Sequence, residues 1–489
     1  MDKKVTCFIA NGSVKDLKVT IDGLQKVSCI EKVYVVAAEK PVDELLKDGV
    51  DWIKGDSLKT TDVVKSIADK CDTPYALIYS KNLPLNLGAF AVDRLASVAD
   101  DTSAGLVYSD YVKVSDGKRK PNPVIDYQDG SLRDDFDFGS VLFYDSSALK
   151  SAVADMDATY KFAGLYDLRL KVSQKSRILR LPEPLYTEME TDTRHSGEKI
   201  FDYVDPKNRE VQIEMEKACT DHLKKIGGWL KPEFENIEFD KSDFPVEASV
   251  IIPVMNRVKT VEDAVKSVLS QKTPFKFNLI VVDNHSTDGT SEILEKYAAD
   301  DDRLIHVIPE RKDLGIGGCW NQGAFHPACG KFAIQLDSDD MYIDDNVIKT
   351  VVEAFYDQNC AMVIGSYRMV NFKLEEIPPG IIDHREWTPD NGRNNALRIN
   401  GLGAPRAFYT PVLRKVRVPN TSYGEDYALG LNISRKYQIG RIYDPLYLCR
   451  RWDDNSDASL DIQKMNAHNI YKDRIRTMEL WARIKMNKQ

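Results

Sequence analysis

Two carboxylates, Asp337 and Asp339, stand two residues apart directly after a short apolar segment, residues 332–336. Such a segment is typical of a buried strand, so both carboxylates are expected at a strand end. Carboxylate oxygens placed there can hold Mg²⁺ or Mn²⁺, and the ion can bridge a diphosphate and neutralise the charge that grows on a leaving group. For this pair taken alone, a solvated turn rich in acids is the alternative interpretation.

A second acidic pair, Glu425 and Asp426, precedes residues 427–434, whose pattern predicts a helix. The positive end of a helix dipole favours an ionised carboxylate at that position. We expect Asp426 to act as a general base, because one positioned carboxylate is enough to take the proton of an attacking hydroxyl. Glu425 would orient Asp426 or bind the acceptor, and helix capping without catalysis is the alternative for both acids.

The elements that must position these acids alternate between strands and helices in the second half of the chain. Short apolar runs separated by helical patterns predict an α/β fold with a mainly parallel sheet covered on both faces. Ligands bind beyond the carboxyl ends of such strands, where Asp283 and Asp337 are expected at one strand end each. The expected strands are residues 249–252, 277–282, 304–308 and 332–336, and the expected helices are residues 258–271, 290–299 and 317–325.

Four motifs follow one another in this half: Pro-Val-Met-Asn-Arg at 253–257, Val-Val-Asp-Asn-His-Ser-Thr-Asp-Gly-Thr at 281–290, Asp-Ser-Asp-Asp at 337–340 and Gly-Glu-Asp-Tyr at 424–427. The series resembles the family 2 glycosyltransferases of the GT-A fold over residues 246–459. Members of that family transfer a sugar from a nucleotide diphosphate-sugar to an acceptor hydroxyl with inversion. A lone Asp-x-Asp is weak evidence, but the four motifs together at family-like spacing are a strong signal.

The resemblance implies a role for each matching residue. Asp339 would ligate Mn²⁺ or Mg²⁺, and Asp337 would contact the metal or the ribose. Asp283 would accept the ring N–H of a uracil-like base, beside main-chain groups placed by Pro253. Asp340 would belong to the acceptor side or simply cap the next helix.

Two segments differ from the family pattern. In residues 310–323, glycines would let a helix start pass close to the diphosphate, and Arg311 or Lys312 would balance its charge. A helix capped by a flexible turn with solvated bases is the alternative. The closing segment of the family often carries Arg-x-His, but Trp452 holds the His position here. A third protein ligand to the metal is therefore in doubt, and Arg450 or Arg451 becomes the candidate diphosphate clamp. Trp452 would stack on a sugar on the acceptor side or merely pack.

The first half repeats the plan of the second without its chemistry. Four sequence blocks recur in the same order, among them Pro184-Leu-Tyr, which matches Pro445-Leu-Tyr, and this predicts two related domains in tandem. The general similarity of any two α/β halves is the alternative. In the first copy Ala37 takes the place of Asp283, residues 80–82 that of residues 337–339, and Leu165 that of Asp426. This copy is therefore expected to be a GT-A-like domain without catalysis.

The division expected along the chain has four parts. Residues 1–205 form the degenerate GT-A-like domain, residues 206–247 a helix and linker, residues 248–460 the catalytic GT-A domain, and residues 461–489 a basic C-terminal helix. The C-terminal helix would dock on the protein or on a partner subunit, or touch an anionic membrane where a lipid-linked acceptor waits.

Composition narrows the class of protein further. The 489 residues carry a net charge of −9, opposite in sign to that of most proteins bound to nucleic acid. No apolar run approaches the roughly 20 residues that cross a bilayer. The eight cysteines lie far apart without a Cys-x-x-Cys pair, which indicates free thiols. A cytoplasmic protein at the inner face of a membrane fits these features, and a homo-oligomer is compatible with them.

The leading hypothesis is an inverting, metal-dependent glycosyltransferase of polysaccharide biosynthesis that uses a nucleotide diphosphate-sugar, with a UDP-sugar favoured, and a glycan or lipid-linked acceptor. A sugar nucleotidyltransferase is one alternative, but it needs a Gly-rich basic loop after the first strand, which residues 253–257 lack. A non-catalytic carbohydrate-binding or scaffold protein is the other, and the carboxylates of the second half argue against it.

Overall fold

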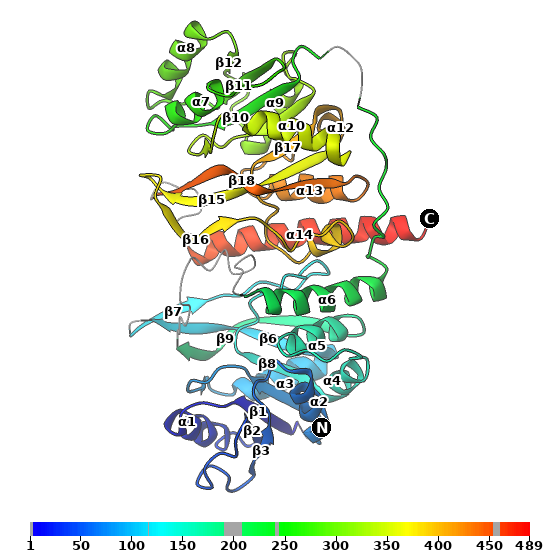
Figure 1. Ribbon diagram of the computed structural model, residues 1–489. Coiled ribbons are helices and arrows are strands. Elements are labelled where there is room, and N and C mark those ends of the chain that lie inside the picture. The colour runs from blue at the N-terminus through cyan, green and yellow to red at the C-terminus, as the bar shows by residue number, and fades with distance from the viewer. Residues whose placement is uncertain (1–2, 116, 190–207, 240–243, 453–459) are drawn as a thin grey trace. The chain divides into compact units, whose positions relative to one another are not determined.

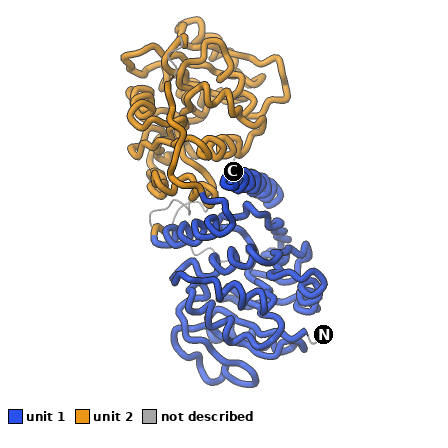
Figure 2. The backbone as a smooth tube through the Cα atoms, turned by 90° about the vertical axis from the view of Figure 1, so that its right-hand side faces the viewer, with its two compact units in different colours: residues 1–194, 210–229, 461–489 blue, residues 195–209, 230–460 orange. Residues whose placement is uncertain are grey.

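The computed structural model describes residues 3–115, 117–189, 208–239, 244–452 and 460–489. The chain divides into two compact units, shown in different colours in Figure 2. The first unit comprises Met1–Arg194, Glu210–Trp229 and Asp461–Gln489, and the second comprises His195–Arg209 and Leu230–Leu460. The C-terminal segment thus groups with the first half of the chain.

Within the described residues, the first unit contains a nine-stranded sheet in the order β3-β2-β1-β4-β8-β6-β9-β5, with β7 paired to β6 (Figure 1). Its strands are β1 (Val5–Ala10), β2 (Ile30–Ala37), β3 (Val50–Lys54), β4 (Tyr75–Tyr79), β5 (Asn86–Leu87), β6 (Ala104–Ser115), β7 (Lys118–Asn122), β8 (Val141–Asp145) and β9 (Arg177–Met189). Its helices are α1 (Val14–Leu24), α2 (Thr61–Lys70), α3 (Ala91–Thr102), α4 (Ser146–Ala154), α5 (Gly164–Ser173), α6 (Arg209–Ile226) and α14 (Ile462–Asn487).

The second unit repeats this topology strand for strand, in the order β12-β11-β10-β13-β17-β15-β18-β14, with β16 paired to β15. Its strands are β10 (Ala248–Val254), β11 (Phe277–Asp283), β12 (Leu304–Val307), β13 (Phe332–Gln335), β14 (Met341–Tyr342), β15 (Met362–Asn371), β16 (Glu376–Ile382), β17 (Arg406–Tyr409) and β18 (Ile439–Arg451). Its helices are α7 (Val261–Leu269), α8 (Thr290–Asp300), α9 (Ile316–Phe325), α10 (Val347–Gln358), α11 (Gly392–Asn395), α12 (Thr410–Val416) and α13 (Glu425–Ser434).

The prediction of an α/β protein with two tandem GT-A-like sheets is confirmed. The strands are parallel from β12 to β13, and β17 then runs antiparallel between β13 and β15. The expected elements of the second half are present with shifted ends, the largest shift being the expected helix 258–271, which is limited to α7. All residues of β11 are buried, as expected for a strand whose sheet is covered on both faces.

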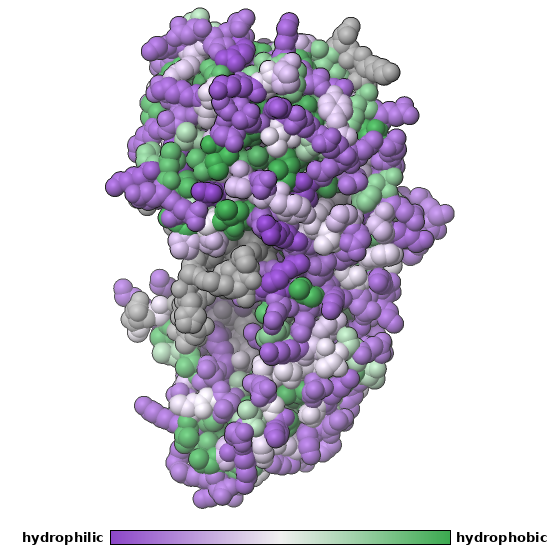
Figure 3. Space-filling model, viewed as in Figure 1, coloured by the Kyte–Doolittle hydropathy of each residue, from purple (hydrophilic) through white to green (hydrophobic). Residues whose placement is uncertain are grey.

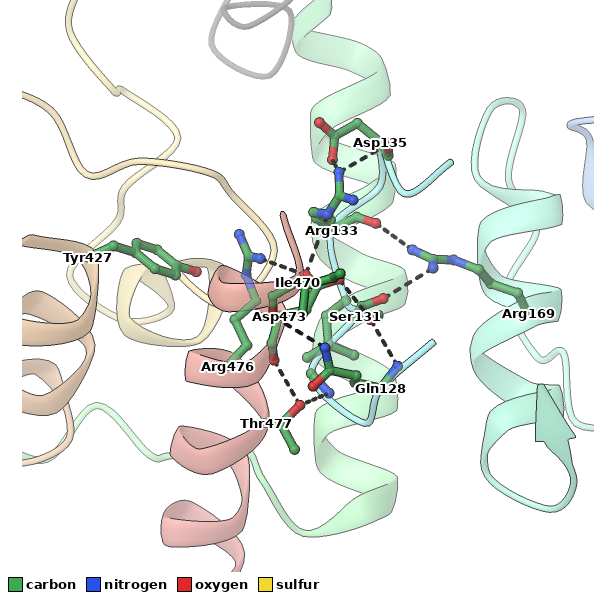
Figure 4. Close-up of polar contacts among 12 residues, drawn as sticks. Gln128, Ser131, Arg133, Asp135, Arg169, Tyr427, Ile470, Asp473, Arg476 and Thr477 are labelled. Atoms are coloured by element: carbon green, nitrogen blue, oxygen red, sulfur yellow. Dashed lines mark hydrogen bonds and ion pairs between the residues drawn. The ribbon is translucent and has the colours of Figure 1, made fainter. Parts of the chain in front are cut away.

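The C-terminal helix α14 packs on the loop of residues 128–135 in the same unit (Figure 4). Ser131 Oγ donates to Asp473 Oδ2 at 2.9 Å, and the backbone N–H of Gly130 donates to Thr477 Oγ1 at 2.9 Å. Asp473 is fully buried and paired with Arg133 and Arg476 at 3.4 and 2.9 Å. A buried carboxylate needs such partners, so this network fixes where the helix lies on its own unit.

The polarity of α14 differs from the simple amphipathic pattern that its sequence indicates. Its two acids, Asp473 and Glu479, are buried and paired with Arg476 and Arg483. The residues that it leaves exposed include Ile470, Arg474, Met478, Trp481 and Lys485, and Lys488 directly after the helix is exposed as well. The exposed side of the helix is therefore both cationic and apolar.

Hydrophilic residues cover much of the face shown in Figure 3. Within the part of the chain that the structure describes, every helix is too short or too polar to span a lipid bilayer. All eight cysteines are unpaired, as predicted.

Candidate active site

Three parallel strands of the second unit, β10, β11 and β13, end at the same edge of the sheet. Val254 at the end of β10 pairs with Asp283 on β11, and Ile251 pairs with Gln335 on β13. Asp283 and the turn of residues 337–340 therefore follow the two strands that flank β10. The predicted placement of acids at strand ends matches this register.

Asp283 is completely buried and bonded inside the protein. Its Oδ2 lies 3.2 Å from His306 Nε2 and also accepts the Ser291 hydroxyl, while its Oδ1 accepts the backbone N–H of Ser286 at 2.9 Å. Burial alone would raise the pKa of Asp283, but these hydrogen bonds outweigh it and hold the pKa well below its usual range. Pro253 lies half-buried beside it, paired with Val282. The base-reading role of Asp283 and Pro253 stays a prediction.

The turn of residues 337–340 is held by hydrogen bonds from the neighbouring strands. Gln335 Nε2 donates to Asp337 Oδ1 at 2.8 Å, and the Asp337 N–H donates to Tyr447 Oη at 3.0 Å. Asp340 is buried and accepts the backbone N–H of Arg450 at 2.7 Å. Helix α10 begins after Asn346, so Asp340 does not cap it; its acceptor-side role stays a prediction.

The carboxylates of this turn repel one another. Burial is the main cause that raises the pKa of Asp337, with Arg406 opposing the rise and Asp339 adding to it. Burial, Asp339 and Asp337 together raise the pKa of Asp340 well above its usual range. A divalent cation fits this donor set, because its charge would relieve the repulsion.

The described residues contain no cluster of three or more His, Cys, Asp and Glu side chains placed to hold a metal. The metal-binding role of Asp337 and Asp339 stays a prediction, and in a site with two protein carboxylates substrate phosphates and water complete the coordination shell. Mg²⁺ is commonly held in this way, by one or two carboxylates together with substrate phosphates.

The side chain of Asp339 faces Trp452 and Arg257. The Trp452 indole N–H donates to Asp339 Oδ2 at 3.3 Å, and Arg257 Nε lies 3.9 Å from the same oxygen. The Trp452 ring packs on Phe372, with ring centroids 5.4 Å apart. The acceptor-side role of Trp452 stays a prediction, but the structure adds a contact to the candidate metal ligand.

Arg450 has a structural role within this turn. Its side chain is 2% exposed, its Nη1 lies 2.8 Å from Asp263 Oδ2 on α7, and its Nε donates to the Asp339 carbonyl oxygen. These interactions link α7 to the turn of residues 337–340, which we call the acidic turn. Arg451, half-buried at the end of β18, is then the candidate diphosphate clamp from this segment.

The glycine-rich block of residues 310–323 is exposed at its start and packs tightly at the beginning of α9. A Cβ at Gly317 would lie 1.8 Å from the Pro419 carbonyl oxygen, so no larger residue fits there. Arg311 in this block is 65% exposed and pairs with Asp313 at 2.6 Å. Its role at the diphosphate stays a prediction.

The first turn of α13 places the second acidic pair, Glu425 and Asp426, close to Arg406. The sequence patterns did not indicate this arginine as a site residue. Arg406 Nη1 lies 2.6 Å from Asp426 Oδ2 and 3.0 Å from the Gly403 carbonyl oxygen. Arg406 is the first residue of β17, whose neighbour β13 leads into Asp337. Burial alone would lower the pKa of Arg406, but the charges of Asp426, Asp337 and Glu425 outweigh it and raise the pKa. Arg406 therefore connects the two acidic pairs electrostatically.

Glu425 is held close to this arginine but is not ion-paired to it. Burial, and next the charge of Asp426, raise the pKa of Glu425 to about 8, so its protonated form is favoured at neutral pH. Its Oε2 is buried without a hydrogen-bond partner among the described residues. Such an oxygen is suited to a ligand hydroxyl, in keeping with the predicted acceptor-side role.

The first unit has other residues at the matching positions. Lys81, after β4, forms an ion pair with the buried Glu188 of β9, at the place where the second unit has its acidic turn. β2 ends at Ala37, and α5 has Leu165 in its first turn. Among the described residues, the first unit therefore has the ion-paired Lys81 at the position where the second unit has the carboxylates of residues 337–340.

A family profile and the related proteins both identify the chain as a glycosyltransferase of one family. The sequence profile of Glycosyl transferase family 2 matches residues 249–415. The putative teichuronic acid biosynthesis glycosyltransferase TuaG of Bacillus subtilis (strain 168) is 37% identical over 189 residues, covering 38% of this chain and 72% of that protein. An uncharacterized glycosyltransferase of Rickettsia conorii is 30% identical over 199 residues, and the chain spans 31% of its length.

Solved structures also resemble part of the chain. Staphylococcus aureus TarS 1–349 in complex with UDP-GlcNAc aligns with a TM-score of 0.38 and 22% identity, covering 48% of this chain and 72% of that one. The mannosyltransferase PcManGT from Pyrobaculum calidifontis, in complex with GDP-Man and Mn²⁺, aligns with a TM-score of 0.33 and 17% identity, covering 55% of this chain and 83% of that one.

Proposed function

The chain belongs to glycosyl transferase family 2, and from that membership we propose that its second unit transfers a sugar, with inversion, from a nucleotide diphosphate-sugar to an acceptor hydroxyl. A UDP-sugar is the favoured donor, and a glycan or lipid-linked saccharide is the acceptor. The observation that carries this proposal is the convergence of two acidic pairs on Arg406: Asp426 is ion-paired to it at 2.6 Å, and Asp337 acts on its charge. An in-line displacement needs a site for the leaving group on one face of the transferred sugar and a base for the attacking hydroxyl on the opposite face.

On the donor side, Asp337 and Asp339 would hold Mn²⁺ or Mg²⁺. The ion would supply Lewis-acid stabilisation of the diphosphate leaving group. Burial, and next the repulsion between the carboxylates, raise the pKa values of Asp337 and Asp340, and a cation in this place would relieve that repulsion. Arg451 and Arg311 would add positive charge near the diphosphate, and Asp283 with Pro253 would receive the base.

On the acceptor side, Asp426 would take the hydroxyl proton. Its carboxylate lies in the first turn of α13, where the helix dipole and Arg406 both favour the ionised form. The neutral Glu425 would donate a hydrogen bond to the acceptor sugar. Trp452 and Asp340 would complete this side.

The first unit would not catalyse transfer. Lys81 and its partner Glu188 occupy the place of the metal-binding turn, and neither Ala37 nor Leu165 supplies a carboxylate. We propose that this unit binds a glycan or supports a homo-oligomer. The exposed cationic and apolar residues of α14 would allow it to contact an anionic membrane surface at the inner face of the cell membrane.

The test is a thermal-shift screen of the whole chain against UDP-, GDP- and dTDP-sugars, each with Mn²⁺ and with a chelator. We expect a shift that needs both the metal and one class of nucleotide, and that disappears in Asp339→Asn. A chain that shifts with none of these donors would instead be a carbohydrate-binding or scaffold protein.

A further inference from the structure

Trp452 is held in a fixed orientation just after β18. Its ring packs at an interplanar angle of 46° on Phe372, and Lys259 Nζ lies 5.7 Å from its ring centroid. The side chain is half-buried. A large ring with contacts on its faces has little rotational freedom, so the direction of its N–H is also fixed.

That N–H points to the carboxylate of Asp339. The indole nitrogen can only donate, and Trp452 Nε1 lies 3.3 Å from Asp339 Oδ2. An ionised carboxylate has about four lone-pair positions, so the hydrogen bond from Trp452 is compatible with metal binding by the same side chain. Hydrogen bonds of this kind orient metal-binding side chains and commonly change metal affinity by about 10- to 100-fold.

We propose that Trp452 is a positioning residue that orients Asp339 for a divalent cation through its indole N–H. This inference rests on the proposed function, in which Asp339 binds the metal. Trp452 cannot ligate a metal itself, so it would act through the carboxylate. The protein would then offer two carboxylates of fixed orientation, and the cation would bind much more tightly when a nucleotide diphosphate supplies further oxygens.

Ring packing and N–H donation are separable by substitution. Phenylalanine keeps a ring that can pack on Phe372 but has no N–H, whereas histidine keeps a ring nitrogen that can donate to Asp339 or bind the metal. Trp481 offers a matched control, because its indole N–H also donates to a carboxylate, that of Asp129, at 2.9 Å. Trp481 and Asp129 both belong to the first unit, whereas the turn of residues 337–340 belongs to the second.

The experiment titrates Mn²⁺ alone into the whole chain and counts free ion by electron paramagnetic resonance, and repeats the titration with UDP present. Trp452→Phe should weaken Mn²⁺ binding about tenfold, while Trp452→His binds at least as tightly as the native chain and Trp481→Phe is unchanged. UDP should tighten Mn²⁺ binding in every chain that retains Asp339. Circular dichroism melts confirm that each variant is folded.

The outcomes separate the two claims. If Asp339→Asn binds Mn²⁺ as the native chain does, the proposed metal site is wrong. If Asp339→Asn loses Mn²⁺ but Trp452→Phe retains native affinity, the metal site stands and the positioning role of Trp452 is overturned. Equal weakening in Trp452→Phe and Trp452→His would also overturn it, because ring size rather than the N–H would then orient Asp339.

Discussion

Replacing Arg406 by glutamine should make the chain less stable and, at the same time, a better binder of Mn²⁺. Arg406 is ion-paired with Asp426 at 2.6 Å, and the two side chains are 17% and 27% exposed. Breaking a fully buried ion pair costs about 3–5 kcal/mol, and breaking an exposed pair costs about 0–1 kcal/mol. The partial exposure of this pair places the expected loss of unfolding free energy at about 2 kcal/mol.

The effect on the metal has the opposite sign. Arg406 carries a positive charge that acts on Asp337, one of the two proposed ligands. Without that charge the acidic turn attracts a cation more strongly, and we expect Mn²⁺ to bind about tenfold more tightly, equivalent to about 1.4 kcal/mol. A general loss of structure would weaken metal binding. Lower stability together with tighter Mn²⁺ binding would therefore identify an electrostatic role for Arg406.

The assays are urea unfolding at pH 7.5 and Mn²⁺ titration followed by electron paramagnetic resonance. Arg303→Gln is the matched control, because Arg303 forms a similar half-buried pair with Asp301 at 2.7 Å and lies outside the site. The control should lose some stability and keep native Mn²⁺ affinity. Weaker or unchanged Mn²⁺ binding in Arg406→Gln would refute the idea that Arg406 is the counter-charge of the acidic turn.

Three further outcomes are expected. Burial, and next the charge of Asp426, raise the pKa of Glu425 from its ordinary value of 4.5 to about 8, so the unfolding free energy should fall as pH rises from about 4.5 to about 8. Glu425→Gln should flatten that fall in urea melts at several pH values. A melt series with the same slope in both chains would show that Glu425 is not held neutral. Asp283→Asn should weaken UDP binding about tenfold in calorimetry while Mn²⁺ binding alone is kept, and equal loss of both would contradict a base-reading role. Lys485→Glu with Lys488→Glu should abolish co-sedimentation with vesicles rich in anionic phospholipid, because each cation contributes about 1 kcal/mol, and no change would exclude α14 as the membrane contact.

The fold could be predicted from the sequence because the patterns that identify its strands and helices are local. Apolar runs such as those of β10 and β11 are short, β-branched and bounded by turn residues, and the same runs recur in the first half. The insertion of β17 between β13 and β15 was not predicted, because strand order is set by contacts between residues far apart in the chain. The same insertion carries Arg406 into the site.

The sequence predicted those residues of the site that belong to its motifs. Asp337 and Asp339 lie on one turn and the Glu425–Asp426 pair on one helix, so each pair is local in the sequence, and the resemblance to the family implied its role. Arg406 belongs to no motif, and its role follows only from its 2.6 Å pairing with Asp426.

Two other residues show what sequence patterns leave out. Arg450 looked like a phosphate-binding arginine, but burial and its bond to Asp263 make it a structural residue. Gly317 is required by the Pro419 carbonyl oxygen, a contact across the fold that no local pattern contains.

The central claim is that the second unit carries the chemistry, with Asp339 on the donor side and Asp426 as the base. The most direct measurement is release of nucleoside diphosphate from the donor that the thermal-shift screen selects, in the presence of Mn²⁺ and a panel of glycan and lipid-linked acceptors. Asp339→Asn and Asp426→Asn should each lower turnover about 10²- to 10⁴-fold, and only Asp339→Asn should also weaken Mn²⁺-dependent binding of the donor. Lys81→Met, in the first unit, should leave turnover near the native rate. Near-native turnover in Asp426→Asn, or a loss in Lys81→Met as large as that in Asp339→Asn, would contradict the account.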